Sequence, residues 1–361
     1  MSAVITKTDT LKPRRILVMR LGAIGDCLRV LPAVARLRRD LPDVHIAWAV
    51  EHWVQPVLAG HPGINRFHVL DRRELKGGFR RALAEIRRFS AEVRAEKYDV
   101  VLDFHGRFKS GLLGWLSRAP LRIGFAKGDE TEGNHLFTNV HVKLADTWEN
   151  RVLRFLHLLA PLGVSTGYDP TAHGLHIDPD ALDKAWRWYD QAGHPPLAAY
   201  PGTSAKRERE RWPEDKWIEL LRQLGDEGIR SVVFWGPAER ELCERIATGA
   251  GPMCRLAPNT TLPDMMAMIG GFRVFIGSDT AAMHMAWMQG VPTAVFLGPK
   301  PTRAIEPLPP VPSRVLRAME HYVEGRRSSQ QKDEIVTAVT VEAARRAVHE
   351  LSGTGQGATQ T

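Results

Sequence analysis

Cysteine and long apolar runs are scarce in this sequence. Cys27, Cys243 and Cys254 are scattered, odd in number and without metal-ligand spacing, a pattern typical of a reducing compartment. No run of about 18 apolar residues is present, so no membrane-spanning helix is expected. The N-terminal segment MSAVITKTDTLKPRR lacks the apolar core of a signal peptide. We therefore expect a cytoplasmic protein.

Motifs for a catalytic metal are also lacking. HExxH does not occur, and the one DxD, Asp178-Pro179-Asp180, precedes the helix-forming segment ALDKAWRWY. Acidic residues at that place are better suited to cap the helix than to hold a divalent ion. The sequence therefore predicts no metal site, and any phosphate that binds must be neutralised by cations and backbone amides.

Charge is unevenly distributed along the chain. The net charge is +8, and residues 1–163 hold 27 Lys and Arg against 17 Asp and Glu. This basic first half predicts an anionic partner, such as a phosphorylated lipid, an acidic sugar or a nucleic acid. Its densest stretch, residues 72–97, has apolar residues at helical spacing flanked by arginines. We expect an amphipathic helix there, either solvated or facing an anionic membrane surface.

Short β-branched or aromatic segments alternate with helix-period segments, which predicts an α/β fold with doubly wound parallel sheets. The expected strands are residues 15–20, 45–50, 67–70, 99–104, 197–200, 231–235, 273–277 and 293–297. The expected parts are a Rossmann-like domain over 1–175, a second over 190–335, a helix over 336–351 and a disordered tail over 352–361. A ligand cleft is expected between the two domains.

The segment RILVMRLGAIGDCLRV, residues 15–30, runs a predicted strand into a glycine-bearing turn and a helix. The turn lacks the third glycine of a dinucleotide fingerprint and ends in the carboxylate of Asp26. That carboxylate would repel a diphosphate placed on the same amides. Two roles stay open for Asp26: a cap on the helix, or a general base that accepts a proton from a hydroxyl group.

Three segments of the second half place polar groups directly after predicted strands. FIGSDTAAMH offers the amides of a helix start, AYPGTSAKRERERWP offers hydroxyls and clustered cations, and WGPAERE offers an acid suited to a ribose diol. For each segment, a capped helix or a solvated, salt-bridged loop is the competing interpretation. The candidate ligand-binding residues are Thr203, Ser204, Lys206, Arg209, Arg211, Glu239, Asp279, Thr280, Ala281 and His284.

Taken in this order, the four segments resemble glycosyltransferase family 9, the lipopolysaccharide heptosyltransferases. The resemblance covers most of the chain and implies a GT-B fold, with two Rossmann-like domains facing a central cleft. The first domain would bind the acceptor and the second the nucleotide sugar. The resemblance also implies an inverting, metal-independent transfer of a heptose from ADP-heptose to a lipopolysaccharide core or a similar anionic glycan.

The resemblance assigns roles to individual residues. Asp26 would be the catalytic base, the candidates of the second half would bind the donor, and Gly25 would contact the acceptor. Arg107 and Lys109 are further candidates to contact the acceptor, and a solvated helix start is the competing interpretation for both. The implied partners are a nucleotide sugar and an anionic glycolipid at the inner face of the cytoplasmic membrane, with no nucleic acid. No cofactor is expected beyond the donor. Oligomeric state is not predicted.

The chain departs from the family pattern at two positions. Ala281 stands where the family usually has glycine, and Glu210 stands where it often has lysine. Under the resemblance, the cation that neutralises the diphosphate would therefore be Lys206, Arg209 or Arg211. Two alternative functions stay open: a nucleotide-sugar epimerase or hydrolase of GT-B fold, and a non-catalytic protein that binds a nucleotide or glycan.

Overall fold

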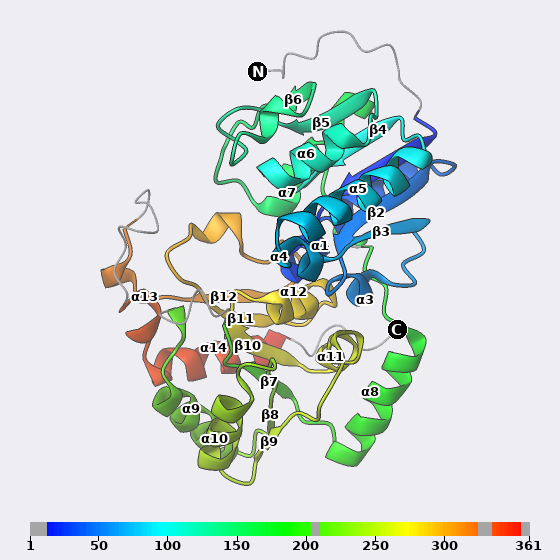
Figure 1. Cartoon of the computed structure of the whole chain (residues 1–361). Coiled ribbons are helices and arrows are strands. Elements are labelled where there is room, and N and C mark those ends of the chain that lie inside the picture. The colour runs from blue at the N-terminus through cyan, green and yellow to red at the C-terminus, as the bar shows by residue number, and fades with distance from the viewer. Residues whose placement is uncertain (1–12, 173, 204–209, 324–333, 355–361) are drawn as a thin grey trace. The chain divides into compact units, whose positions relative to one another are not determined.

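The computed structural model describes residues 13–172, 174–203, 210–323 and 334–354. The chain divides into two units, residues 1–176 and 177–361, and each contains a six-stranded sheet in which every neighbouring pair is parallel (Figure 1). The predicted α/β class with two parallel sheets is confirmed.

The first unit has the strand order β3-β2-β1-β4-β5-β6. Its strands are β1 Arg15–Met19, β2 His45–Glu51, β3 Arg66–Leu70, β4 Val100–Asp103, β5 Leu121–Phe125 and β6 Val140–Val142. Its helices are α1 Ile24–Leu28, α2 Leu31–Asp40, α3 Gln55–Leu58, α4 Arg72–Lys76, α5 Phe79–Ala95, α6 Phe108–Leu116 and α7 Arg151–His157, with 3-10 helices η1 Asn134–Leu136 and η2 Ala160–Leu162. The central strand β1 is apolar and almost fully buried, as expected for a parallel strand covered on both faces.

The second unit has the strand order β12-β11-β10-β7-β8-β9. Its strands are β7 Leu197–Tyr200, β8 Ser231–Val233, β9 Cys254–Leu256, β10 Val274–Ser278, β11 Thr293–Phe296 and β12 Ser313–Leu316. Its helices are α8 Pro179–Ala192, α9 Glu214–Asp226, α10 Arg240–Ala250, α11 Leu262–Ile269, α12 Ala281–Met288, α13 Glu334–Thr337 and α14 Val341–Thr354, with 3-10 helices η4 Thr302–Ala304 and η5 Met319–His321.

A tryptophan cluster anchors the segment that precedes α9. Trp212 stacks on Phe296 with ring centroids 4.6 Å apart, and Trp217 meets Trp212 edge-on at 5.2 Å. The Trp212 indole also donates to the Val339 carbonyl at 3.0 Å. Ring packing and this hydrogen bond together hold Trp212 in place. Its neighbour Arg211 is therefore attached to a fixed point of the backbone.

Parallel strands place the residues that follow them along one edge of each sheet. In the second sheet Gly277 pairs with Tyr200, so Thr280 and Thr203 each lie three residues beyond a shared register position. In the first sheet Met19 pairs with both Ala49 and Asp103, which aligns the ends of β1, β2 and β4. Asp26, Thr203 and Thr280 therefore follow the carboxyl ends of strands in the two sheets.

Several local predictions can be compared with the structure. Asp178 caps α8 by accepting a hydrogen bond from the Ala181 amide at 2.9 Å, as expected. The amphipathic helix expected in the basic stretch 72–97 is present as α5, and the short helix α4 precedes it. Of the tail expected over 352–361, residues 352–354 belong to α14, which corrects the prediction there, and residues 355–361 lie outside the described residues. No helix in the described ranges is both long and apolar enough to cross a membrane.

Candidate active site

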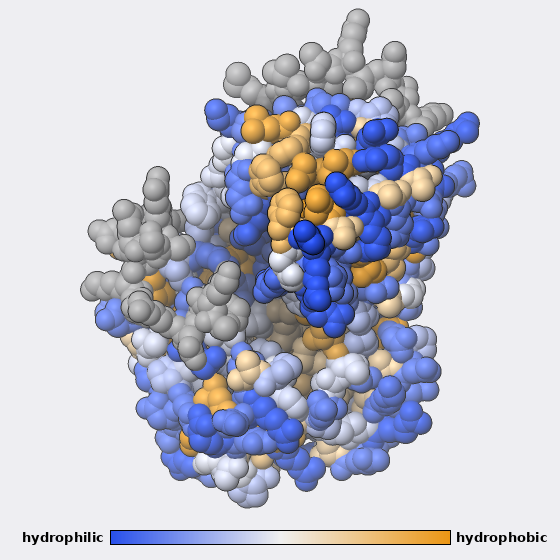
Figure 2. All heavy atoms as spheres, in the orientation of Figure 1, coloured by the Kyte–Doolittle hydropathy of each residue, from blue (hydrophilic) through white to orange (hydrophobic). Residues whose placement is uncertain are grey.

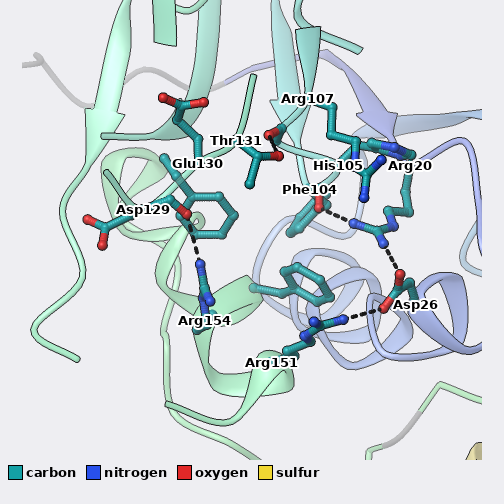
Figure 3. Close-up of a pocket in the computed structure, with 13 residues that line it drawn as sticks. Arg20, Asp26, Phe104, His105, Arg107, Asp129, Glu130, Thr131, Arg151 and Arg154 are labelled. Carbon is teal, nitrogen blue, oxygen red and sulfur yellow. Dashed lines mark hydrogen bonds and ion pairs between the residues drawn. The ribbon is translucent and has the colours of Figure 1, made fainter. Parts of the chain in front are cut away.

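A pocket of about 180 Å³ opens at the carboxyl end of the first sheet. The loops after β1, β4 and β5 and the start of α7 form its walls (Figure 3). Its lining residues are Arg20, Asp26, Phe104, His105, Gly106, Arg107, Phe125, Asp129, Glu130, Thr131, Arg151, Arg154 and Phe155. Among these lining residues, every permanently charged cation is an arginine.

Asp26 is held at the pocket wall by guanidinium groups. The N-cap residue of α1 is Ala23, which corrects the interpretation of Asp26 as the helix cap. Arg29 and Arg151 each place an Nη1 atom 3.1 Å from Asp26 Oδ1, and Arg20 contacts Oδ2. Both carboxylate oxygens thus have cationic partners, which fixes the orientation of the side chain while it stays 22% exposed.

The arginines around Asp26 differ in exposure, and so in what they can still bind. Arg20 and Arg29 are buried, and Arg20 also donates to the Phe104 carbonyl at 2.7 Å. Arg151 begins α7 and its side chain is 36% exposed, so it can reach an anionic ligand. Arg154 faces the same pocket but donates to the carbonyls of Thr147 and Asp129, which gives it a structural role.

His105 supplies a neutral group to the pocket. Its Nδ1 accepts a hydrogen bond from the Leu21 amide at 3.3 Å, which leaves the ring proton on Nε2. Burial, reinforced by the positive charges of Arg20 and Arg107, lowers the pKa of His105 to about 3. The ring is therefore uncharged at neutral pH.

A buried amide–carboxylate pair fixes the loop after β4. Asp103 accepts hydrogen bonds from the amides of His105 at 2.9 Å and Gly106 at 3.0 Å, and from Asn134 Nδ2 at 2.7 Å. Burial raises the pKa of Asp103, and these hydrogen bonds oppose the rise. Asn134 also donates to the Arg107 carbonyl at 2.9 Å, so the pair sets the backbone that carries His105 and Arg107.

The depressed pKa of His105 makes stability depend on pH. Below about pH 6.5 His105 is protonated in the unfolded chain but stays neutral in the folded chain. The free energy of unfolding therefore decreases as the pH is lowered. We expect H105Q to remove about 2 kcal/mol of the stability difference between pH 7 and pH 5, or a few °C in Tm. Thermal unfolding at both pH values checks this, with exposed His141 changed to Gln as the matched control. An unchanged pH slope in H105Q would contradict it.

Unused hydroxyl groups mark the carboxyl edge of the second sheet. The hydroxyl oxygens of Thr203, Ser278 and Thr280 are buried and have no hydrogen-bond partner within the described parts of the chain. Buried polar groups are normally paired, so a set of unpaired hydroxyls indicates a place where a polar ligand binds. Thr280 is also the N-cap residue of α12, where backbone amides favour an anion.

Charged residues surround the start of α12. Lys300 donates to Asp279 Oδ2 at 2.8 Å, and His284 Nε2 lies 3.7 Å from Asp279 Oδ1. Asp279 is therefore bound by Lys300 in the loop after β11. The N-cap residue of α12 is Thr280, not Asp279 as one interpretation of the sequence had it. Ala281 is the first helical residue and is absent from the described positions with positive φ, so its Cβ imposes no left-handed backbone.

Glu239 lies where β7 and β8 end. It precedes α10, and a Cβ built on Gly202 or Gly236 would come within 3.3 Å or 2.7 Å of its side chain. Burial raises the pKa of Glu239, and the charge of Arg211 opposes the rise. The two glycines therefore leave room for this carboxylate at the rim of the sheet, where an acid can receive hydrogen bonds from a diol.

The structure separates the remaining residues that the sequence predicted for the site. Ser204, Lys206 and Arg209 lie outside the described residues. Lys109 donates to Glu51 Oε1 at 2.6 Å and does not line the pocket, whereas Arg107 does. Gly25 is buried in α1. A Cβ built on Gly298 would lie 2.4 Å from Glu210 Oε2, so this carboxylate faces the loop after β11.

Sequence reasoning missed Arg151, Arg154, His105 and Lys300. Arg151 and Arg154 are one turn apart after Asn150, which caps α7 through the Val152 amide at 3.0 Å. A cap followed by two arginines on one helix face was the signal that could have found them. Among the described residues, no group of three or more His, Cys, Asp or Glu side chains could hold a metal ion.

Comparison with known proteins identifies relatives over most of the chain. A family model described as glycosyltransferase family 9 (heptosyltransferase) matches residues 86–333. Lipopolysaccharide heptosyltransferase 1 of Salmonella typhimurium is 28% identical over 290 residues, which span 79% of this chain and 88% of the relative.

Solved structures share the fold. A family 9 glycosyl transferase from Veillonella parvula has a TM-score of 0.78 at 21% identity, covering 94% of this chain and 97% of the other. The E. coli heptosyltransferase WaaC, solved with ADP-2-deoxy-2-fluoro heptose, has a TM-score of 0.73 at 23% identity, covering 93% of this chain and 99% of the other. The expected two-domain α/β fold of the GT-B type is confirmed.

Proposed function

Because this chain belongs to glycosyltransferase family 9, as its ordered motifs predict, we propose that it transfers a heptose from ADP-heptose to a lipopolysaccharide core. The relative from Salmonella typhimurium is named as a lipopolysaccharide heptosyltransferase, and WaaC was solved with a fluorinated ADP-heptose. The acceptor is an anionic glycolipid, and the enzyme works peripherally at the inner face of the cytoplasmic membrane.

The observation that carries the proposal is the partly exposed carboxylate of Asp26 in a pocket whose cations are arginines. A guanidinium fork matches the carboxylates and phosphates of an anionic glycan. The most exposed guanidinium on Asp26 is that of Arg151, which would bind such a group and hold an acceptor hydroxyl near the carboxylate. The neutral ring of His105 can donate a further hydrogen bond to the acceptor.

The reaction is a single displacement with inversion. Asp26 takes the proton from the acceptor hydroxyl as its oxygen attacks the anomeric carbon of the heptose. The bond from that carbon to the diphosphate breaks, and its electron pair leaves with ADP. The free hydroxyls of Thr203 and Thr280 and the amides at the start of α12 stabilise the developing charge, with no metal required. Glu239 binds the ribose.

A nucleotide-sugar panel tests the donor. We expect ADP-heptose at a hundredfold excess over its Kd to raise Tm by about 5 to 10 °C. UDP-, GDP- and CMP-sugars should leave Tm nearly unchanged. Transfer to an isolated lipopolysaccharide-core acceptor should persist in excess EDTA. A larger shift with another nucleotide would overturn the donor assignment, and strict dependence on magnesium would overturn the metal-free chemistry.

The alternatives raised by the sequence have weaker support. Family membership favours a transferase over an epimerase or hydrolase, and a carboxylate in an arginine-lined pocket favours turnover over simple binding. Release of free heptose from ADP-heptose without acceptor would favour a hydrolase. Donor binding without any product would favour a non-catalytic protein.

A further inference from the structure

One surface of the first unit exposes large apolar side chains in a group. Phe108 and Trp115 are seven residues apart on α6, hence on one side of the helix, and are 49% and 53% exposed. Leu136, on the adjoining η1, is 74% exposed. Figure 2 shows hydrophobic residues gathered over α6 and the segments beside it. We call Phe108, Trp115 and Leu136 the α6 face.

These residues belong to one packed surface. The rings of Phe108 and Phe137 meet edge-on with centroids 5.0 Å apart, which joins α6 to the residue that follows η1. Single exposed apolar residues are ordinary, but a contiguous group with aromatic members marks an interaction site. Aromatic rings are also suited to a boundary that is apolar on one side and wet on the other.

Positive charge frames this face. Helix α6 contains no acidic residue, the exposed Arg107 precedes it and the exposed Arg118 follows it. The neighbouring helix α5 exposes Arg80, Arg81 and Arg87. On the opposing side, Glu132 lies 3.5 Å from Arg107. Apolar side chains bordered by arginines complement an anionic lipid surface.

The α6 face adjoins the pocket that holds Asp26. Arg107 lines the pocket and is the N-cap residue of α6, directly before Phe108. Thr131 lines the same pocket, and η1 begins three residues later. An acceptor whose sugars enter the pocket and whose acyl chains stay in a bilayer would therefore bring the bilayer to this side of the unit.

We propose that the α6 face docks on an anionic bilayer, with Trp115 and Leu136 entering the interface and the arginines contacting lipid phosphates. The identity of the lipid-linked acceptor rests on the proposed function, but the docking itself needs no acceptor. Binding to vesicles therefore tests the docking face, and transfer to a delipidated soluble acceptor tests the function, so that failure of either is seen separately.

The experiment measures co-sedimentation of the full chain with acceptor-free vesicles. We expect binding to phosphatidylethanolamine vesicles that contain phosphatidylglycerol, weaker binding to pure phosphatidylcholine, and loss of binding as salt rises. The double variant W115S/L136S should bind at least about tenfold more weakly. Phe108 stays unchanged because it adjoins Arg107 of the pocket.

A matched control changes equally exposed residues elsewhere. Trp186 and Met319 of the second unit are 52% and 64% exposed, so W186S/M319S removes similar side chains from another surface. This control should bind vesicles like the wild type, and both double variants should keep the wild-type Tm and the wild-type kcat on a soluble acceptor. Equal binding by W115S/L136S and the wild type would overturn the proposal.

Two further measurements separate a bilayer from other occupants. W115F should keep binding but reduce the quenching of tryptophan fluorescence by brominated lipids, because Trp115 would no longer report from the interface. If W115F and the wild type were quenched equally, Trp115 would not enter the interface and the proposed orientation would be wrong. If light scattering showed a wild-type dimer that W115S/L136S turns into a monomer, the face would be a subunit interface and the proposal would be wrong.

Discussion

Replacing Asp26 with asparagine is expected to lower the rate of transfer by about 10²- to 10⁴-fold while the Kd for ADP-heptose stays within about twofold of the wild-type value. Asparagine keeps the size of the side chain but cannot accept the proton of the acceptor hydroxyl. Asp26 belongs to the first unit, whereas the residues assigned to the donor belong to the second. Single-turnover kinetics measure the rate of transfer. The change in Tm during titration with ADP-heptose measures the Kd.

A matched control exists for this variant. Asp169 lies in the same unit, is 26% exposed against 22% for Asp26, and also binds an arginine, Arg39, at 2.8 Å. Because Asp169 lies outside the pocket, D169N should transfer heptose at the wild-type rate. Near-normal turnover in D26N would remove the base assignment. Equal losses in both variants would point to a general effect of losing an arginine partner.

Replacing Arg151 with methionine is expected to raise the KM for the acceptor by about 10- to 100-fold, because hydrogen bonds to charged groups contribute about 1.5 to 3 kcal/mol. Donor affinity should not change. A smaller fall in kcat should accompany the rise in KM, since the Arg151 guanidinium also holds Asp26 Oδ1 at 3.1 Å. Steady-state kinetics with each substrate varied in turn measure both parameters.

The partner of Asp169 provides the control for Arg151. Arg39 is 51% exposed against 36% for Arg151, and R39M removes the same kind of exposed guanidinium from an ion pair outside the pocket. R39M should leave both KM values unchanged. If R151M lowered kcat without raising the acceptor KM, Arg151 would serve only to position Asp26 and would not contact the acceptor.

The strands inside both sheets were mostly predictable, and the strands at the edges mostly were not. The expected strands correspond to β1–β4, β7, β8, β10 and β11, and of these only β3, which reads RFHVL, lies at a sheet edge. The missed strands β5, β6, β9 and β12 lie toward or at the sheet edges and read LRIGF, VHV, CRL and SRVL. Strands with a solvated side lack the continuous apolar run that identifies a buried parallel strand.

The site was predictable where backbone geometry and motif coincide, and not where distant side chains converge. Asp26, Thr203 and Thr280 follow predicted strands, so their position at a sheet edge could be inferred. Arg151 is 125 residues from Asp26, and a sequence pattern cannot distinguish it from an arginine on a solvated helix. The pair of Asp103 and Asn134 was missed for the same reason, since it joins residues 31 apart.

The all-arginine composition of the cations around the pocket determines how constant its charge is. Guanidinium groups stay protonated at every pH at which a cell grows, and lysine acetylation cannot neutralise them. The one imidazole in the wall gains no charge until about pH 3. The positive charge that these guanidinium groups bring to the pocket is therefore insulated from acid stress and from metabolic acylation.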